Sequence, residues 1–255
     1  MTSTLRLYTF AISHFSEKAR WALDLNGLTY TERRLLPGPH IPVIRRRAPK
    51  ATVPVLEHEE GGSKVVVQGS SKVLDYLESR LDAKRLAPPE AMAARSVELE
   101  GRADHAFGLG VQRILYDVLL DRPDIVIGLW TQGAPAWSRL MYRAVYPLLR
   151  RGTTKTYAIY PKKVEEAKER FRRMFEETDR ALTSTRYLLG DEGPTRVDVT
   201  VAALLAPVCL PPEHLIDWPE LDASMRTFQS EFEGRPTWDF VLRMYREHRS
   251  PRRAV

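Results

Sequence analysis

The chain has 255 residues, of which 43% are hydrophobic and 28% are charged, with a net charge of +6. This length allows one or two domains with cores of their own, and the composition is that of an ordinary globular protein. The single cysteine, Cys209, excludes an internal disulfide framework and suits a cytoplasmic protein. The apolar run from Val199 to Leu210 is too short to span a bilayer, so no membrane partner is expected.

Basic residues occur in short clusters, such as 45–47 and 150–151, without the interleaved aromatic side chains that stack on single-stranded nucleic acid. Such clusters are more typical of solvated faces than of nucleic-acid sites. Nucleic acid is therefore not expected as a partner, whereas the surplus charge favours small anionic ligands. The His, Cys, Asp and Glu residues show no metal-ligand spacing, so no metal is expected.

The chain opens on a predicted strand that runs into a helix. Leu5, Leu7 and Phe10 supply the apolar content of a buried strand, and Ser13 stands where the N-cap of a helix belongs. The free N–H groups and the positive dipole end of such a helix favour an anion above the turn. Our interpretation is that this anion is a thiolate.

The rest of the first eighty residues alternates between strands and helices. We predict a strand over 28–35, a short helix over 41–47, a hairpin of strands over 53–56 and 64–67, and a helix over 70–81. The resulting order β-α-β-α-β-β-α is assigned to a domain of residues 1–82. The sequence Ala87-Pro88-Pro89 marks a linker over 83–89.

Beyond the linker the pattern is helical almost throughout. Helices are predicted over 90–120, 135–151, 162–183, 219–232 and 236–248, and an apolar helix is predicted to follow Thr195, which forms a capping box with Asp198. An all-helical domain is therefore expected over 90–250. The chain is expected to fray from Arg249 on, with 251–255 as a tail.

Four motifs in this order resemble the soluble, cytosolic-type glutathione S-transferases. They are the turn and helix of 13–23, the segment Thr52-Val53-Pro54-Val55-Leu56, the helix start of 69–77 and the cap of 195–198. The resemblance, to a serine-type or atypical bacterial-like member, implies an α/β plus all-α architecture. A thioredoxin-like domain with a cis proline would precede an all-helical domain, in a homodimer that uses glutathione as its co-substrate.

The resemblance also implies a catalytic role for Ser13, whose hydroxyl would donate a hydrogen bond to the sulfur of glutathione. Lowering a thiol pKa by about two units needs roughly 2.7 kcal/mol. A hydrogen bond to a charged group supplies about 1.5–3 kcal/mol, and a helix N-terminus adds roughly 0.3–1 kcal/mol. Ser13 could equally serve as a cap alone. Ser16 and Tyr8 are alternative donors to the thiolate.

Other contacts follow from the same resemblance. The backbone of Val53 beside Pro54 would pair with the cysteinyl part of glutathione, and Ser70 would bind the γ-glutamyl carboxylate. Gly69 stands where the family usually has an acid for the ligand's ammonium group. Candidates for the remaining contacts are His40 for the glycine carboxylate, and Gln68 or a cross-dimer Asp104 in place of the missing acid.

The expected function is that of a glutathione S-transferase that activates the glutathione thiolate for attack on an apolar electrophile, as in detoxification. The second substrate would lie between the domains, against Phe107, Val111 and Tyr116. Conjugation, dehalogenation, isomerisation and ether cleavage all remain open. The alternative is a binding or scaffold protein that has the same fold without catalysis.

Overall fold

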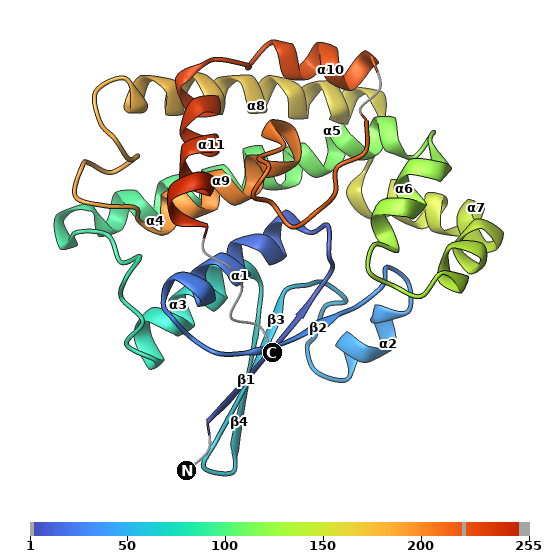
Figure 1. The fold of residues 1–255 in the computed structure, drawn as a ribbon, viewed down its shortest axis with the longest axis horizontal. Coiled ribbons are helices and arrows are strands. Elements are labelled where there is room, and N and C mark those ends of the chain that lie inside the picture. The colour runs from blue at the N-terminus through green and yellow to red at the C-terminus, as the bar shows by residue number, and fades with distance from the viewer. Residues whose placement is uncertain (1–2, 221–222, 250–255) are drawn as a thin grey trace.

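A mixed sheet of four strands forms the first part of the computed structural model, which describes residues 3–220 and 223–249 (Figure 1). The strands are β1 (Thr4–Thr9), β2 (Thr31–Arg34), β3 (Val55–Glu60) and β4 (Ser63–Gln68), in the order β2-β1-β3-β4. The pair β1–β2 is parallel, and the pairs β1–β3 and β3–β4 are antiparallel. Helices α1 (His14–Leu25), α2 (His40–Arg45) and α3 (Ser70–Arg80) complete the predicted thioredoxin-like unit, which is thereby confirmed.

The second part is helical, as predicted. It comprises α4 (Ala93–Ala103), α5 (Gly110–Leu119), α6 (Pro123–Trp130), α7 (Trp137–Tyr157), α8 (Pro161–Leu182), α9 (Arg196–Cys209), α10 (Ala223–Ser230) and α11 (Pro236–His248). Every residue of α9 is buried, and α9 packs against α1, α4 and α11. Its N-terminus has the predicted capping box, in which the backbone N–H of Thr195 donates to the Asp198 carboxylate at 2.8 Å.

Four details differ from the predicted helices. The long helix over 90–120 is divided by a π-helical segment, Asp104–Leu109, that separates α4 from α5. Helix α6 was not predicted, and α7 continues beyond residue 151 to Tyr157. Of the predicted helix over 219–232, the structure describes α10; residues 219–220 and 231–232 are not helical, and residues 221–222 lie outside the described residues.

The expectation of fraying is wrong for Arg249, its first residue. The guanidinium of Arg249 is 2% exposed, and it lies 2.7 Å from the carboxylates of both Glu17 and Asp24 on α1. Burial of a charge is tolerated when opposite charges surround it, so these ion pairs fix the position of Arg249. The predicted tail 251–255 lies outside the described residues.

Helix α1 lies between the sheet and the helical domain (Figure 1). The ring of Phe15 on α1 packs against Gly108 in the π-helical segment so closely that a Cβ at position 108 would lie 2.3 Å from the ring. The ring of His14 makes a 3.0 Å hydrogen bond with the carbonyl of the same glycine. Gly108 thus allows the close approach of the two domains. In the part of the chain that the structure describes, no helix has the length and apolarity needed to cross a bilayer.

Candidate functional site

The strands bring the predicted site segments to one end of the sheet. Tyr8 in β1 is opposite Val55 in β3, and Val55 is opposite Gln68 in β4. The end of β1, the start of β3 and the end of β4 are therefore neighbours. Segment 10–13 leaves this end to enter α1, segment 53–54 enters β3 there, and segment 69–70 enters α3 there.

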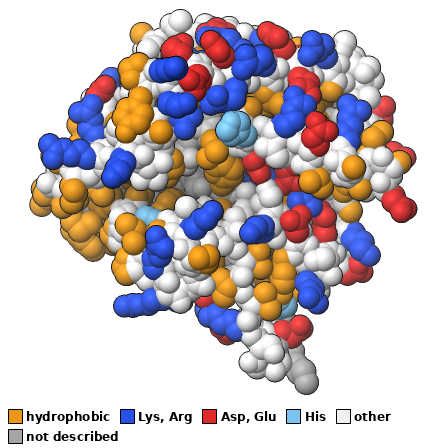
Figure 2. All heavy atoms as spheres, turned by 180° about the vertical axis from the view of Figure 1, so that it is seen from behind, with side chains coloured by type: hydrophobic (Ala, Val, Ile, Leu, Met, Phe, Trp, Pro, Cys, Tyr) orange, Lys and Arg blue, Asp and Glu red, His pale blue; other side chains and the backbone are white. Residues whose placement is uncertain are grey.

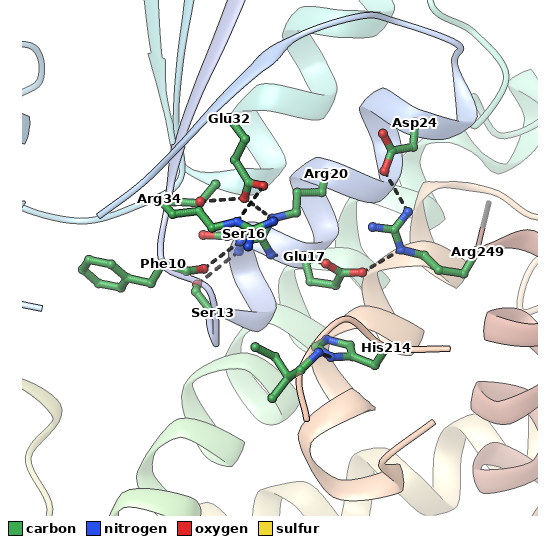
Figure 3. Close-up of polar contacts among 12 residues, drawn as sticks. Phe10, Ser13, Ser16, Glu17, Arg20, Asp24, Glu32, Arg34, His214 and Arg249 are labelled. Atoms are coloured by element: carbon green, nitrogen blue, oxygen red, sulfur yellow. Dashed lines mark hydrogen bonds and ion pairs between the residues drawn. The ribbon is translucent and has the colours of Figure 1, made fainter. Parts of the chain in front are cut away.

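Ser13 is the N-cap of α1, as predicted (Figure 3). Its Oγ accepts a hydrogen bond from the backbone N–H of Ser16 at 3.1 Å, which satisfies one of the free donors of the first turn. The side chain is half-buried, and among the described residues no group accepts a hydrogen bond from its hydroxyl. A hydroxyl has one donor hydrogen and two acceptor lone pairs. The cap uses a lone pair, so the hydrogen remains available for a ligand.

The turn before Ser13 is held by Arg20 of α1, which is fully buried. Its guanidinium donates to the Phe10 carbonyl at 2.7 Å and to the Glu32 carboxylate at 2.5 Å (Figure 3). Thr9 donates to the same carboxylate at 2.8 Å. These bonds join β1, β2 and α1, so they fix the position of the turn relative to the sheet.

The peptide bond between Val53 and Pro54 is cis, as predicted. The Pro54 carbonyl accepts a hydrogen bond from the N–H of Gly69 at 3.0 Å, which places this bend beside the start of α3. Val53 precedes β3, and its own N–H and C=O make no hydrogen bond within residues 3–220 and 223–249. An unpaired backbone edge of this kind can accept an extended peptide as an added strand.

Gly69 and Ser70 form the start of α3. Gly69 is the N-cap with φ of +102°, a conformation that residues with a Cβ rarely adopt. The first N–H groups of α3 point out of the helix without intrahelical acceptors. Ser70 is buried at 5% exposure, and among the described residues no partner for its hydroxyl is found. The geometry resembles that of Ser13, since each serine stands at the start of a helix.

Two further predicted contacts are already occupied by the protein itself. The Gln68 amide donates to the carbonyls of Lys50 at 2.6 Å and Thr52 at 2.9 Å, so it holds the loop before Val53. The ring of His40 bonds to the Gly38 N–H and to the Ala51 carbonyl, both at 3.0 Å. Burial lowers the pKa of His40, so its ring is neutral at pH 7. Both side chains support the shape of the site, and neither offers a free polar group.

Residues 7–85 match the family model described as glutathione S-transferase, N-terminal domain. The chain's N-terminal domain belongs to the glutathione S-transferase family. No protein with a curated description matches the chain in sequence. The match covers β1 from Leu7 on, the other three strands, α1–α3 and all the site segments described above.

Solved structures extend the similarity to the whole chain. A maleylacetoacetate isomerase from Anaeromyxobacter dehalogenans 2CP-1, with bound GSH, is 23% identical with a TM-score of 0.55, covering 95% of this chain and 90% of that one. A glutathione S-transferase of Ceriporiopsis subvermispora, in complex with glutathione, is 16% identical with a TM-score of 0.64, covering 97% and 98%. The β-etherase LigF from Sphingobium sp. strain SYK-6 is 18% identical with a TM-score of 0.59, covering 94% and 99%. At these identities the likeness shows the glutathione S-transferase fold.

The two alternative donors differ from Ser13 in accessibility. Ser16 is fully buried, and its Oγ has no hydrogen-bond partner among the described residues. Tyr8 is also buried, and its hydroxyl donates to Glu57 on β3 at 2.9 Å. Ser16 is 0% exposed and cannot meet a ligand without movement of its surroundings, and the Tyr8 hydrogen is already committed to Glu57. In this glutathione S-transferase fold, Ser13 is the accessible donor of the three.

A buried charge cluster, which the sequence did not reveal, joins the start of α3 to the helical domain. The Lys18 ammonium lies 2.7 Å from Glu100 and 2.9 Å from Asp104, and it also donates to the Ser71 hydroxyl at 2.9 Å. The carboxylate of Glu100 is in turn 2.5 Å from the guanidinium of Arg196 on α9. Asp104 was predicted to reach across a dimer, but it is engaged with its own chain. The only sequence signal was a lysine on the otherwise apolar side of α1.

A second buried cluster lies one turn further along α1. Glu17 is 1% exposed and lies between Arg249 and Arg20, with His214 nearby (Figure 3). Burial alone would raise the pKa of Glu17, but the charges of Arg249, His214 and Arg20 outweigh it and hold this pKa far below the usual range. Glu17 is therefore ionised at neutral pH. Its role in this geometry is to join α1 to the end of the chain.

The residues predicted to line the second-substrate site need correction. Phe107 and Val111 are fully buried and belong to the main core, where the ring of Phe107 packs on Phe171. Tyr116 stacks on Tyr157, and its hydroxyl accepts a hydrogen bond from Trp130 at 3.0 Å. Phe107 and Val111 are therefore on the inner side of the long helix, which a ligand does not reach. The helical spacing predicted an apolar side but not which way it faces.

A different apolar wall lies near the site. Ile12, in the turn before Ser13, and Leu36, after β2, pack against a cluster built from α6 and α7. Tyr142 of α7 also donates a hydrogen bond to the Pro37 carbonyl. The wall beside the site is thus formed by the two helices that the sequence predicted least well. Within residues 3–220 and 223–249, no group of three or more His, Cys, Asp and Glu side chains could hold a metal ion.

Proposed function

We propose that this chain is a glutathione-dependent enzyme that stabilises the thiolate of glutathione at Ser13 for attack on an apolar electrophile. The observation that carries the proposal is the Ser13 hydroxyl, which caps α1 with a lone pair and keeps its hydrogen free. A thiolate above this turn would receive that hydrogen bond together with the positive end of the helix dipole. These are interactions that favour the charged form of the thiol and so lower its pKa.

The neighbouring segments fit the rest of a glutathione molecule. The unpaired backbone of Val53 would bind its cysteinyl part as an added strand, beside Pro54. Ser70 and the free N–H groups of α3 would bind the γ-glutamyl carboxylate. Gln68 and His40 would hold the loops that carry these contacts, in place of the direct contacts predicted for them.

The reaction itself is set by the second substrate. The solved structures that share this fold include an isomerase, a transferase and an etherase, so the fold does not select a reaction. We propose a small apolar electrophile bound against Ile12, Leu36 and Tyr116, since these partly buried side chains pack against one apolar cluster and Ile12 directly precedes Ser13 in the chain. A homodimer in the cytoplasm, with a role in detoxification, completes the proposal.

One observation favours the alternative of a binding or scaffold protein without catalysis. Gly69 has no side chain to meet the ammonium group of glutathione, and its φ of +102° disfavours one. Loss of a charge-assisted hydrogen bond costs about 1.5–3 kcal/mol, which weakens binding roughly 10- to 150-fold. A protein with such a loss could keep the fold and no longer bind glutathione.

The test compares the wild type with Ser13→Ala and Ser16→Ala. Retention on immobilised glutathione is expected for all three proteins, because Val53 and Ser70 are unchanged. Conjugation of glutathione to an aromatic halide should fall by about 10- to 100-fold in Ser13→Ala, equivalent to the loss of a charge-assisted hydrogen bond of about 1.5–3 kcal/mol, and should change little in Ser16→Ala. No retention of the wild type would support the scaffold alternative. Equal activity in all three would exclude the serine mechanism.

A further inference from the structure

Helix α7 has two faces that carry large hydrophobic side chains, and only one of them is covered by the residues that the structure describes. The inner face carries Ser138, Tyr142 and Tyr146, which are buried against α6 and the loop after β2. The outer face carries Trp137, Leu140, Val145 and Leu148, which are 64%, 72%, 40% and 72% exposed. The last three lie three, eight and eleven residues after Trp137, so all four lie along one side of the helix. Single exposed apolar residues are common, but four on one side of a helix form an apolar patch, which marks a surface that binds a partner.

The same helix is strongly basic. Its 21 residues include five cations and no aspartate or glutamate, the cations being Arg139, Arg143, Arg150, Arg151 and Lys155. Arg150 is paired with Asp121, and the other four have no ion pair among the described residues. Helix α8, of similar length, has a mixture of both signs and several ion pairs along its surface. The excess of positive charge is therefore a property of α7 and not of long helices in this chain generally.

The space-filling view shows the patch on the outside of the molecule. Hydrophobic side chains gather at the left edge of Figure 2, on the side where α7 lies, and Lys and Arg side chains stand next to them. Tyr160, which follows α7 in the chain, is another half-exposed aromatic side chain. A Trp, several aliphatic side chains and flanking arginines are the composition of helices that lie in the interface of a membrane.

We propose that the outer face of α7 binds the surface of a membrane that contains anionic lipids. The aliphatic side chains and Trp137 would enter the boundary between headgroups and acyl chains, while the arginines would remain at the level of the lipid phosphates. The helix would lie on the surface, which agrees with the finding that no described helix can cross a bilayer. This revises the expectation from sequence that the protein has no membrane partner.

A second copy of the chain is a poorer occupant of this face. In a two-fold contact the same patch meets itself, so the unpaired arginines of both copies would be brought together. With no acidic residue on α7 to compensate, like charges would oppose each other across the interface. An anionic lipid surface instead supplies the missing negative charge over an area as long as the helix.

Flotation of the full chain with lipid vesicles tests the proposal. The wild type should float with vesicles of phosphatidylcholine and phosphatidylserine, and should remain in solution with vesicles of phosphatidylcholine alone. Binding should weaken several-fold when salt is raised from about 0.1 M to about 0.5 M, because surface charges are then screened. The emission of Trp137, isolated by comparison with Trp137→Phe, should shift to the blue on binding.

Two sets of variants separate the apolar contribution of this face from its electrostatic contribution. Leu140→Ser with Leu148→Ser should reduce the bound fraction by about tenfold or more, and Arg139→Gln with Arg143→Gln should do so at low salt. The matched control is Val97→Ser on α4, a residue 66% exposed outside the patch, which should bind like the wild type. Three results would overturn the proposal: no flotation of the wild type, equal flotation of the Leu and control variants, or a dimer that the Leu variant dissociates while no vesicle is bound.

Discussion

Helices α1 and α7 differ in which side chains they bury and which they expose. Helix α1 buries its charges, since Glu17, Lys18 and Arg20 are at most 1% exposed. Helix α7 exposes its aliphatic residues, since Leu140 and Leu148 are each 72% exposed. Both helices depart from the rule that apolar side chains are buried and polar ones exposed: α1 by burying charged residues, and α7 by exposing leucines.

The two departures indicate different roles for α1 and α7. The buried charges of Lys18 and Glu17 are matched by Glu100 and Arg249, so they hold α1, which carries Ser13 at its N-terminus, against the rest of the chain. The exposed side chains of α7 have no matching surface among the described residues, so they indicate a partner outside the chain. Departures from local rules at functional places are expected, and the following predictions test whether these departures have the stated causes.

The largest effect is expected for Glu17→Ala. Removal of this carboxylate takes one of two carboxylates at 2.7 Å away from Arg249, whose side chain is 2% exposed. Breaking a buried ion pair costs about 3–5 kcal/mol, so the free energy of unfolding in urea should fall by about that amount. The control is Glu169→Ala on α8, whose ion pair with Arg173 is exposed and should contribute less than about 1 kcal/mol. Equal effects of the two substitutions would contradict the account of α1.

His14 is expected to make stability depend on pH. Burial lowers the pKa of its ring to about 4, against about 6.5 in the unfolded chain. A histidine whose pKa is lowered by folding stabilises the protein above its unfolded pKa, and this contribution is lost as the pH falls from about 6.5 to about 4. The loss amounts to about 3 kcal/mol. His14→Gln should remove this part of the pH dependence in urea unfolding, and NMR titration of the wild type should show an imidazole midpoint near 4. A midpoint near 6.5 would show that the ring is not buried as described.

Gly108→Ala probes the contact between α1 and the π-helical segment. The new methyl group would lie 2.3 Å from the ring of Phe15, so the two domains would have to separate slightly. Overpacking of this kind costs about 1–3 kcal/mol. In Gly101→Ala no atom lies within 4 Å of the new methyl group. That control should stabilise the protein by up to about 1 kcal/mol, because alanine favours a helix more than glycine does. Thermal unfolding of both variants measures the difference, and a stabilised Gly108→Ala would exclude the close contact.

The smallest effect on stability is expected at the outer face of α7. Leu140→Ser changes a side chain that is 72% exposed, so the free energy of unfolding should change by no more than about 0.5 kcal/mol. Urea unfolding checks this value. A loss of more than about 1.5 kcal/mol would show that the face is covered within the protein, since core substitutions of leucine cost at least that much.

Sequence patterns predicted most of the N-terminal domain. Its strands alternate with helices at short, well-marked turns, and the residues Ser13, Pro54 and Ser70 occur at element boundaries that local rules describe well. The cis bond before Pro54 and the cap at Ser13 are both present. The cap depends on a few neighbouring residues, so local rules predict it, whereas the cis bond was expected from the resemblance of residues 52–56 to the family.

The features that were missed depend on long-range contacts. Lys18 and Glu100 are far apart in sequence, and nothing local indicates that the two charges are buried together. Phe107 and Val111 are on an apolar helix face in any case, but only the packing of α8 decides that this face is the core. The π-helical segment adds to the difficulty, because it shifts the phase of the side chains between α4 and α5.

The most direct test of the central claim is the pKa of glutathione bound to the protein, followed by the ultraviolet absorption of its thiolate. If Ser13 and the start of α1 stabilise the anion, the thiol of bound glutathione should titrate about two units below its usual value of about 8.5. In Ser13→Ala the thiol should titrate near its usual value although glutathione remains bound. A bound thiol that titrates alike in the wild type and in Ser13→Ala would contradict the assignment of the thiolate to this turn.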